Sequence, residues 1–135
     1  MDLITLNITN NKQITDVSFM TNLKKLDAGG FCEINQFGIK GLDLVKLNIW
    51  ENHRIHDVSF MTNLKKLDIS GQSCGVGRDG IKSLDLIELN IDNNAQIRDI
   101  SFMTNLKKLS AGEYCGIDQQ NIQRLDLIEL ASYIV

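Results

Sequence analysis

The sequence lacks a long apolar run, a strong net charge and an even number of cysteines. No apolar stretch approaches the roughly 18 residues that a membrane helix needs. The opening MDLITLNITN lacks the basic and apolar regions of a secretory signal. A formal net charge of −3 gives no global attraction to nucleic acid, which usually needs a basic domain or face. We therefore expect an intracellular protein whose partners are neither membranes nor nucleic acids.

Three cysteines cannot form a fully paired disulfide framework within one chain, which fits a reducing compartment. The remaining composition is ordinary, because 43% hydrophobic and 23% charged residues are typical of soluble globular chains. We therefore expect a hydrophobic core, and 135 residues suit one domain.

One twelve-residue segment is present three times. DVSFMTNLKKLD begins at Asp16 and again at Asp57, and DISFMTNLKKLS begins at Asp99, so the copies start 41 and 42 residues apart. A shorter pattern, L-x-x-L-x-(L/I/A/S), divides this period and recurs every 20 to 22 residues. Its first leucines are Leu3, Leu23, Leu44, Leu64, Leu86, Leu106 and Leu127. Self-similarity at such a period predicts a solenoid.

The shorter pattern also predicts the form of each unit. Its fourth and sixth letters alternate as in a β-strand, so their side chains face the same side. A unit of about 21 residues cannot bury that side alone, so neighbouring units must stack with parallel strands. We predict an α/β solenoid, an arc with an inner parallel sheet of about seven short strands and short helical or irregular outer turns. Residues 1–135 then form a single domain of about six full units and a terminal strand, without capping domains.

These patterns resemble those of leucine-rich repeat proteins over essentially the whole chain. LNIWENHRIHDVSFMTN and its two counterparts resemble internalin-like units. The units between them, such as CEINQFGIKGLDL, resemble repeats expanded in giant viruses of amoebae. The resemblance implies a horseshoe-shaped viral protein that works as an interaction module or scaffold in the cytoplasm, including that of an infected host cell.

Polar residues and cysteines recur as regularly as the leucines. Asn11, Asn52 and Asn94 follow alternate strands, where an amide satisfies backbone groups of adjacent coils. Cys32, Cys74 and Cys115 recur in the other units. At about 4.8 Å per coil, cysteines two coils apart are near 10 Å, too far for a disulfide or a shared zinc ion. We expect both sets to be structural, with the thiols reduced and buried.

The tripled segment predicts an outer spine and its caps. Phe19, Phe60 and Phe102 recur beside Val17, Val58 and Ile100 and beside Met20, Met61 and Met103, which predicts stacked apolar side chains under the outer turn. The preceding Asp16, Asp57 and Asp99 are expected to cap a short helical turn.

Two patterns that suggest chemistry have structural interpretations. Gly75, Gly77 and Gly80 match G-x-G-x-x-G, but no α/β unit of about 30 residues surrounds them. Gly38, Gly80 and Asn121 share one repeat position, which predicts a positive φ there. His53 and His56 are expected to be exposed, because no third ligand is near them in the pattern. We therefore expect no enzyme activity, no catalytic residue, no metal and no cofactor.

The second, third and fifth letters of each strand are predicted to face the concave side. They place a pair of lysines in every other coil, so the pairs are about 10 Å apart. In the coils between them, the second letter is Ile or Val. Trp50, the only tryptophan, follows a strand and is expected to be exposed. The candidate interface residues are Trp50, Lys24, Lys25, Lys46, Lys65, Lys66, Lys107 and Lys108.

Three interpretations of this face remain open. It is a solvated surface on which lysines discourage aggregation, a site for an unidentified protein partner, or a site for phosphate or another polyanion. Protein recognition is the favoured function and polyanion binding the alternative. Duplication of a two-unit block explains why the exposed Thr, Asn and Lys-Lys letters recur. The uncapped coils at both ends predict a homo-oligomer, as a dimer through the C-terminal coil.

Overall fold

The computed structural model describes residues 2–132. Its strands are three or four residues long and its helices are short. In chain order the elements are β1 (Thr5–Asn7), β2 (Lys25–Asp27), η1 (Phe37–Ile39), β3 (Lys46–Asn48), β4 (Lys66–Asp68), η2 (Arg78–Ile81), β5 (Glu88–Asn90), β6 (Lys108–Ala111), α1 (Gln119–Gln123) and β7 (Glu129–Ser132).

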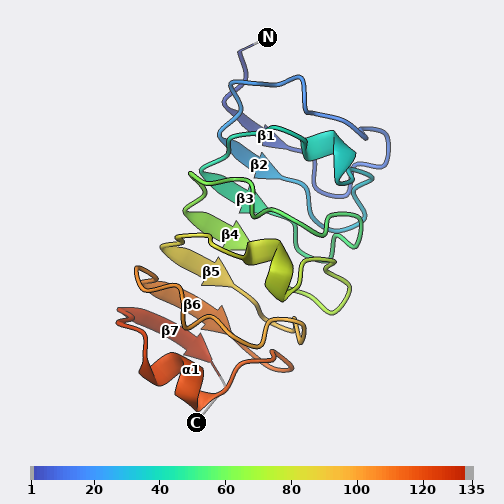
Figure 1. Ribbon diagram of the computed structural model, residues 1–135. Helices are drawn as coiled ribbons and strands as arrows, with labels where there is room; N and C mark the ends of the chain where they lie inside the picture. Colours follow the sequence, from blue (N-terminus) through green and yellow to red (C-terminus); the bar gives the residue numbers. More distant parts are fainter. Residues whose placement is uncertain (1, 133–135) are drawn as a thin grey trace.

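All seven strands belong to one parallel sheet, in which β1 to β7 follow one another in sequence order. Figure 1 shows them stacked as a ladder, with β1 and β7 at its opposite ends. The central leucines of neighbouring strands are register partners, as in Leu6↔Leu26 and Leu26↔Leu47. The predicted α/β solenoid with an inner parallel sheet is therefore confirmed.

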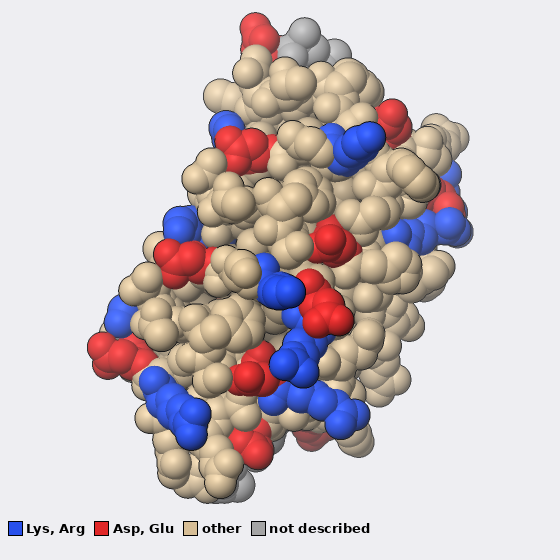
Figure 2. Space-filling view, in the orientation of Figure 1, with Lys and Arg blue, Asp and Glu red and all other residues tan. Residues whose placement is uncertain are grey.

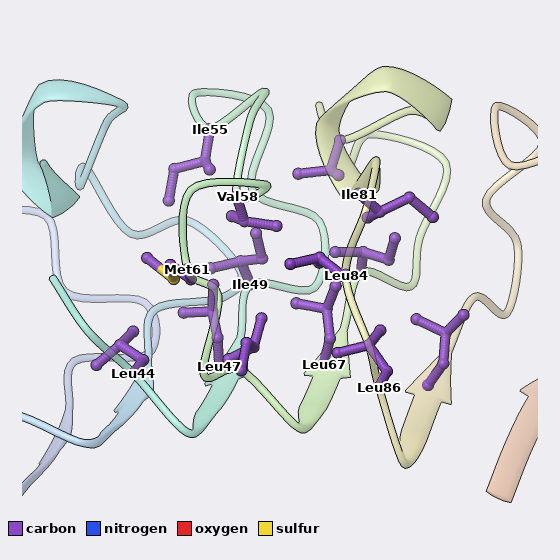
Figure 3. Close-up of a cluster of buried hydrophobic side chains, with 14 of the residues drawn as sticks. Leu44, Leu47, Ile49, Ile55, Val58, Met61, Leu67, Ile81, Leu84 and Leu86 are labelled. Atoms are coloured by element: carbon purple, nitrogen blue, oxygen red, sulfur yellow. The ribbon is translucent and has the colours of Figure 1, made fainter. Parts of the chain in front are cut away.

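The core is the space between the sheet and the turns behind it. Leu44 and Ile49 are 0% exposed and Leu47 is 1% exposed, because the next coils cover them. Figure 3 shows these side chains beside Ile55 and Val58, which enter the same core from the turn behind β3. Full burial of such a side chain contributes about 1.5–3 kcal/mol. The leucines of the repeated L-x-x-L pattern thus stabilise each coil by packing against the neighbouring coils.

The outer turns are of two kinds. The helices η1, η2 and α1 all belong to the cysteine-containing units. The other units turn through an aspartate without forming a helix, so the prediction that these aspartates cap a helical turn is corrected. Asp16 Oδ1 accepts hydrogen bonds from Ser18 N at 2.8 Å and from Ser18 Oγ at 2.6 Å. Asp57 and Asp99 make the same pair of bonds in their own units.

The predicted apolar spine is confirmed at its Val, Ile and Met positions, which pack in the core, and is wrong at its phenylalanines. Phe19, Phe60 and Phe102 are 67%, 39% and 41% exposed, whereas Val17 is fully buried. The cause is a β-turn in which Met20 N donates to Val17 O at 2.9 Å. The ends of this turn face the core, and its central residues, Ser18 and Phe19, face outward.

The positive-φ prediction for Gly38, Gly80 and Asn121 is also wrong, because none of them has a positive φ. A Cβ on Gly38 would collide with the carbonyl oxygen of Thr15, and a Cβ on Gly80 would collide with that of His56. These glycines are therefore required by the close approach of the neighbouring coil. Positive φ occurs instead just after each of the first six strands, at Asn10, Gly30, Glu51, Gly71, Asn93 and Tyr114, and also at Gly41 and Ser83.

Within residues 2–132, helices stay far shorter and more polar than a membrane crossing requires.

Candidate binding face

The concave face of the sheet carries two rows of side chains, separated by the central leucines of the strands, which are buried in β2 to β6. The register of the strands defines the first row as Thr5, Lys25, Lys46, Lys66, Glu88, Lys108 and Glu129. The second row, two residues further along each strand, is Asn7, Asp27, Asn48, Asp68, Asn90, Ser110 and Ala131. Over β3 to β7 these rows line an open hollow of about 640 Å³. A partner would meet charges, amides and hydroxyls here.

The two lysines of each repeated pair have different surroundings. Lys25 is exposed in the first row. Lys24 Nζ instead donates to two oxygens of Asp43, the backbone oxygen at 3.0 Å and Oδ2 at 3.2 Å. Lys65 and Lys107 reach Asp85 and Asp126 in the same way. This arrangement corrects the expectation that both lysines of each pair face the concave side, since the first of each pair lies at the margin where the strands begin.

The margin aspartates join coils that are not consecutive. Asp43 Oδ1 accepts a hydrogen bond from Asn63 Nδ2 at 2.9 Å while its Oδ2 contacts Lys24, so one carboxylate holds the coils before and after its own. The hydrogen bond from Asn63 and the contact with Lys24 lower the pKa of Asp43. Asp85 joins Asn105 and Lys65 in the same manner.

Duplication is therefore not the whole reason why the Asn and the first Lys of the repeated segment recur. Asn63 and Lys24 each contact the carboxylate of Asp43, so these letters also have a structural role. Sequence reasoning missed the aspartates themselves. The available signal was the L-D-L that ends the cysteine-containing unit at residues 42–44 and recurs at 84–86 and 125–127.

The first row changes its electrostatic character along the stack. From β4 onward basic and acidic residues alternate: Glu88 Oε1 lies 3.6 Å from Lys66 Nζ and 3.7 Å from Lys108 Nζ. Lys108 also lies 3.9 Å from Glu129. Over β2 and β3, by contrast, Lys25 and Lys46 form no ion pair with any residue between 2 and 132. Figure 2 shows basic and acidic side chains intermingled over the visible face and paired along the margin where the strands begin.

The second row contains a carboxylate that is costly to ionise. Asp68 accepts hydrogen bonds from Ser70 N at 2.9 Å and Ser70 Oγ at 2.6 Å. Burial raises its pKa despite these bonds, and the charges of Asp92 and Asp27 raise it further. Asn90 Nδ2 approaches the other oxygen of Asp68 at 3.4 Å. The second row therefore presents carboxylate acceptors, Asp27 and Asp68, beside the lysines.

Trp50 is partly buried and lies away from the hollow of the concave face. Its indole covers the backbone of Gly29 and Gly30, since a Cβ on Gly29 would overlap the indole ring. It lines a second hollow of about 470 Å³ beyond the strand ends, together with Phe31, Lys12 and other residues. The expectation of an exposed tryptophan is corrected: the pair of glycines in the preceding unit makes room for its ring.

The asparagines after alternate strands bond to the backbone of neighbouring coils. Asn52 is 1% exposed, and its Nδ2 donates to Ala28 O at 3.0 Å and to Ile34 O at 3.3 Å. Asn94 repeats this arrangement with Ile69 O and Val76 O. Asn52 and Asn94 also accept from Arg54 N and Gln96 N of their own coils. Within residues 2–132, the side chain of Asn11 makes only bonds of this second kind, from Gln13 N and Ile14 N.

The cysteines and histidines lie where the turns place them. Cys32 and Cys74 are buried and Cys115 is partly buried, and all three are free thiols. Burial raises the pKa of each, that of Cys74 to about 11. His53 and His56 are exposed. Within residues 2–132, no group of three or more His, Cys, Asp or Glu side chains is placed to hold a metal ion.

The glycines of the G-x-G-x-x-G match belong to a repeat turn. Gly77 precedes the short helix η2 with an extended backbone, and Gly75 and Gly80 approach backbone oxygens of the preceding coil. Their spacing thus follows from coil packing.

Comparison of the chain with models of protein families and with curated proteins returns no match. The evidence for its function therefore lies in the repeat and in the concave face.

Proposed function

We propose that the chain is a leucine-rich repeat module that binds a protein partner on its concave face and catalyses no reaction. The observation that carries this proposal is the open hollow of about 640 Å³, lined by side chains of five consecutive strands. Stacked repeats create extended concave surfaces of this kind, which suit a polypeptide partner. The L-x-x-L pattern on every strand supports assignment to leucine-rich repeats.

A second candidate is binding of phosphate or another polyanion by the first row. The absence of an ion pair for Lys25 and Lys46 within the described residues favours it. The carboxylates of Asp27, Asp68 and Glu88 oppose it, because they lower the positive potential of the same face. Protein recognition explains both signs of charge and is the preferred function.

The test compares two double variants that add equal charge. Asn48→Glu with Asn90→Glu places two carboxylates in the concave hollow, whereas Gln72→Glu with Gln120→Glu places them at exposed positions in a turn and in α1. Proteins captured from cell extract at elevated salt are identified by mass spectrometry. We expect the captured set to be lost with the concave variant and kept with the turn variant. Retention by both variants would exclude the concave face as the site.

The origin, location and assembly of the chain are part of the same proposal. The alternation of internalin-like and cysteine-containing units underlies the inference of a viral protein acting inside a host cell. Homo-oligomer formation stays a prediction. Light scattering that gives the monomer mass of 15.2 kDa at high concentration would contradict it.

A further inference from the structure

Lysines from three neighbouring strands lie in direct register on the concave face. Lys25 is the partner of Lys46, and Lys46 is the partner of Lys66, across strands about 4.8 Å apart. All three are exposed. Like charges directly opposite on neighbouring strands are destabilising. This lysine row therefore carries repulsion that bound negative charge would relieve.

The rest of the structure leaves the repulsion largely uncompensated. Thr5, the register partner of Lys25 on β1, is uncharged. Of the three lysines only Lys66 forms an ion pair within residues 2–132, and it shares its partner, Glu88, with Lys108. The adjacent Lys65 gives an internal comparison, because it lies beside the row but contacts Asp85.

The second row indicates which kind of anion fits. Asp27, Asn48 and Asp68 lie two residues beyond the three lysines, on the same face. An oligophosphate on the lysines would meet the carboxylates of Asp27 and Asp68. A peptide would place acidic side chains on the lysines and turn its backbone N–H groups towards those carboxylates.

We propose that strands β2 to β4 bind an acidic peptide segment of the protein partner, with Lys25, Lys46 and Lys66 contacting its carboxylates. This inference rests on the proposed function and specifies the chemistry of the partner. The interaction is electrostatic at an exposed face, so its affinity falls as the salt concentration rises.

The experiment uses a fluorescein-labelled octapeptide of alternating Glu and Ser, a matched peptide of Gln and Ser, and inorganic tripolyphosphate. Binding to the full chain is measured by fluorescence anisotropy and by competition. Lys46→Gln and Lys65→Gln remove the same charge, and urea unfolding checks that both variants are folded. We expect Lys46→Gln to weaken binding of the acidic peptide about 3- to 5-fold and Lys65→Gln to weaken it less than about 2-fold.

Three results would overturn the inference. Equal losses for the two variants would show that only net charge matters, and equal binding of the neutral peptide would remove the role of the carboxylates. Tighter binding of tripolyphosphate, with the same dependence on Lys46, would assign the lysine row to phosphate. Any of these results, if the concave glutamate variant still loses captured proteins, would refute the acidic segment and leave the proposed function standing.

Discussion

At the scale of the residue, the buried asparagines show how one side chain connects coils. The amide of Asn52 satisfies two carbonyl groups that the turn leaves facing the interior, at Ala28 and Ile34. An apolar residue of similar size would leave both oxygens without a partner. The amide is therefore part of the backbone hydrogen bonding of the solenoid.

We predict that Asn52→Ala lowers the free energy of unfolding by about 2–3 kcal/mol, because a buried group left without its partner costs about 1–3 kcal/mol. Urea denaturation measures the change. Asn11→Ala is the control, since within residues 2–132 the side chain of Asn11 bonds only to Gln13 N and Ile14 N of its own coil. Equal losses in the two variants would show that contacts between coils are not the cause.

The reactivity of the cysteine thiols tests how deeply each residue is buried. Cys74 is 1% exposed and its pKa is raised to about 11, so almost no reactive thiolate forms at pH 8. We predict that iodoacetamide modifies Cys115 first and that Cys74 reacts at least about 10-fold more slowly in the native protein than in urea. Mass spectrometry of peptides from timed samples measures each rate. Similar native rates at both cysteines would contradict the described burial.

At the scale of the element, the margin aspartates explain polar letters that strand formation alone does not need. Each of Asp43 and Asp85 binds an asparagine from one neighbouring coil and a lysine from the other. Two adjacent lysines consequently have different roles, because the first completes this bridge and the second faces the concave side. A repeat unit therefore needs the polar contacts of its margin aspartate as well as its buried apolar residues.

We predict that Asp43→Asn lowers stability at pH 7 and has little effect in strong acid. Asn63 and Lys24 hold the pKa of Asp43 below its ordinary value of 3.8. The ionised carboxylate thus contributes stability above pH 3.8, which is lost as the pH falls through the lower folded-state pKa. Urea midpoints at a series of pH values test this. Asp79→Asn, at an exposed position in η2, is the control. A pH-independent loss would contradict the ionic origin.

At the scale of the whole molecule, stability depends on position in the stack. The central leucine of β4, Leu67, is 3% exposed between neighbouring coils, whereas the equivalent Leu130 of β7 is 46% exposed. In a solenoid the stability is close to a sum of unit terms and neighbour interfaces. The same residue therefore contributes differently in the middle and in the last strand.

We predict that Leu67→Ala lowers the free energy of unfolding by about 2–5 kcal/mol, the range for a leucine truncated in a packed core. Leu130→Ala should cost less than about 2 kcal/mol, because nearly half of this residue is already in water. Chemical denaturation followed by circular dichroism measures both. Equal costs would indicate that another chain covers β7, which would support the predicted homo-oligomer.

The spacing of the leucines determined the architecture from sequence alone. A segment of about 21 residues with one apolar side has few ways to cover it, and parallel stacking of like segments is the one that a regular repeat satisfies. The positions of the strands and the inward side chains follow from the same alternation. These features are local or repeat exactly, so they could be predicted without coordinates.

Only the tertiary structure decided which polar side chains meet and which turn residues face outward. Lys24 and Asp43 are 19 residues apart, and their contact depends on the register between coils and on the path of the turn. Phe19 faces solvent because a single hydrogen bond between Met20 and Val17 closes the turn around it. Gly38 is required by an oxygen of another coil. Such contacts depend on distances of a few ångströms between segments remote in sequence, and a repeat pattern specifies the order of coils but not those distances.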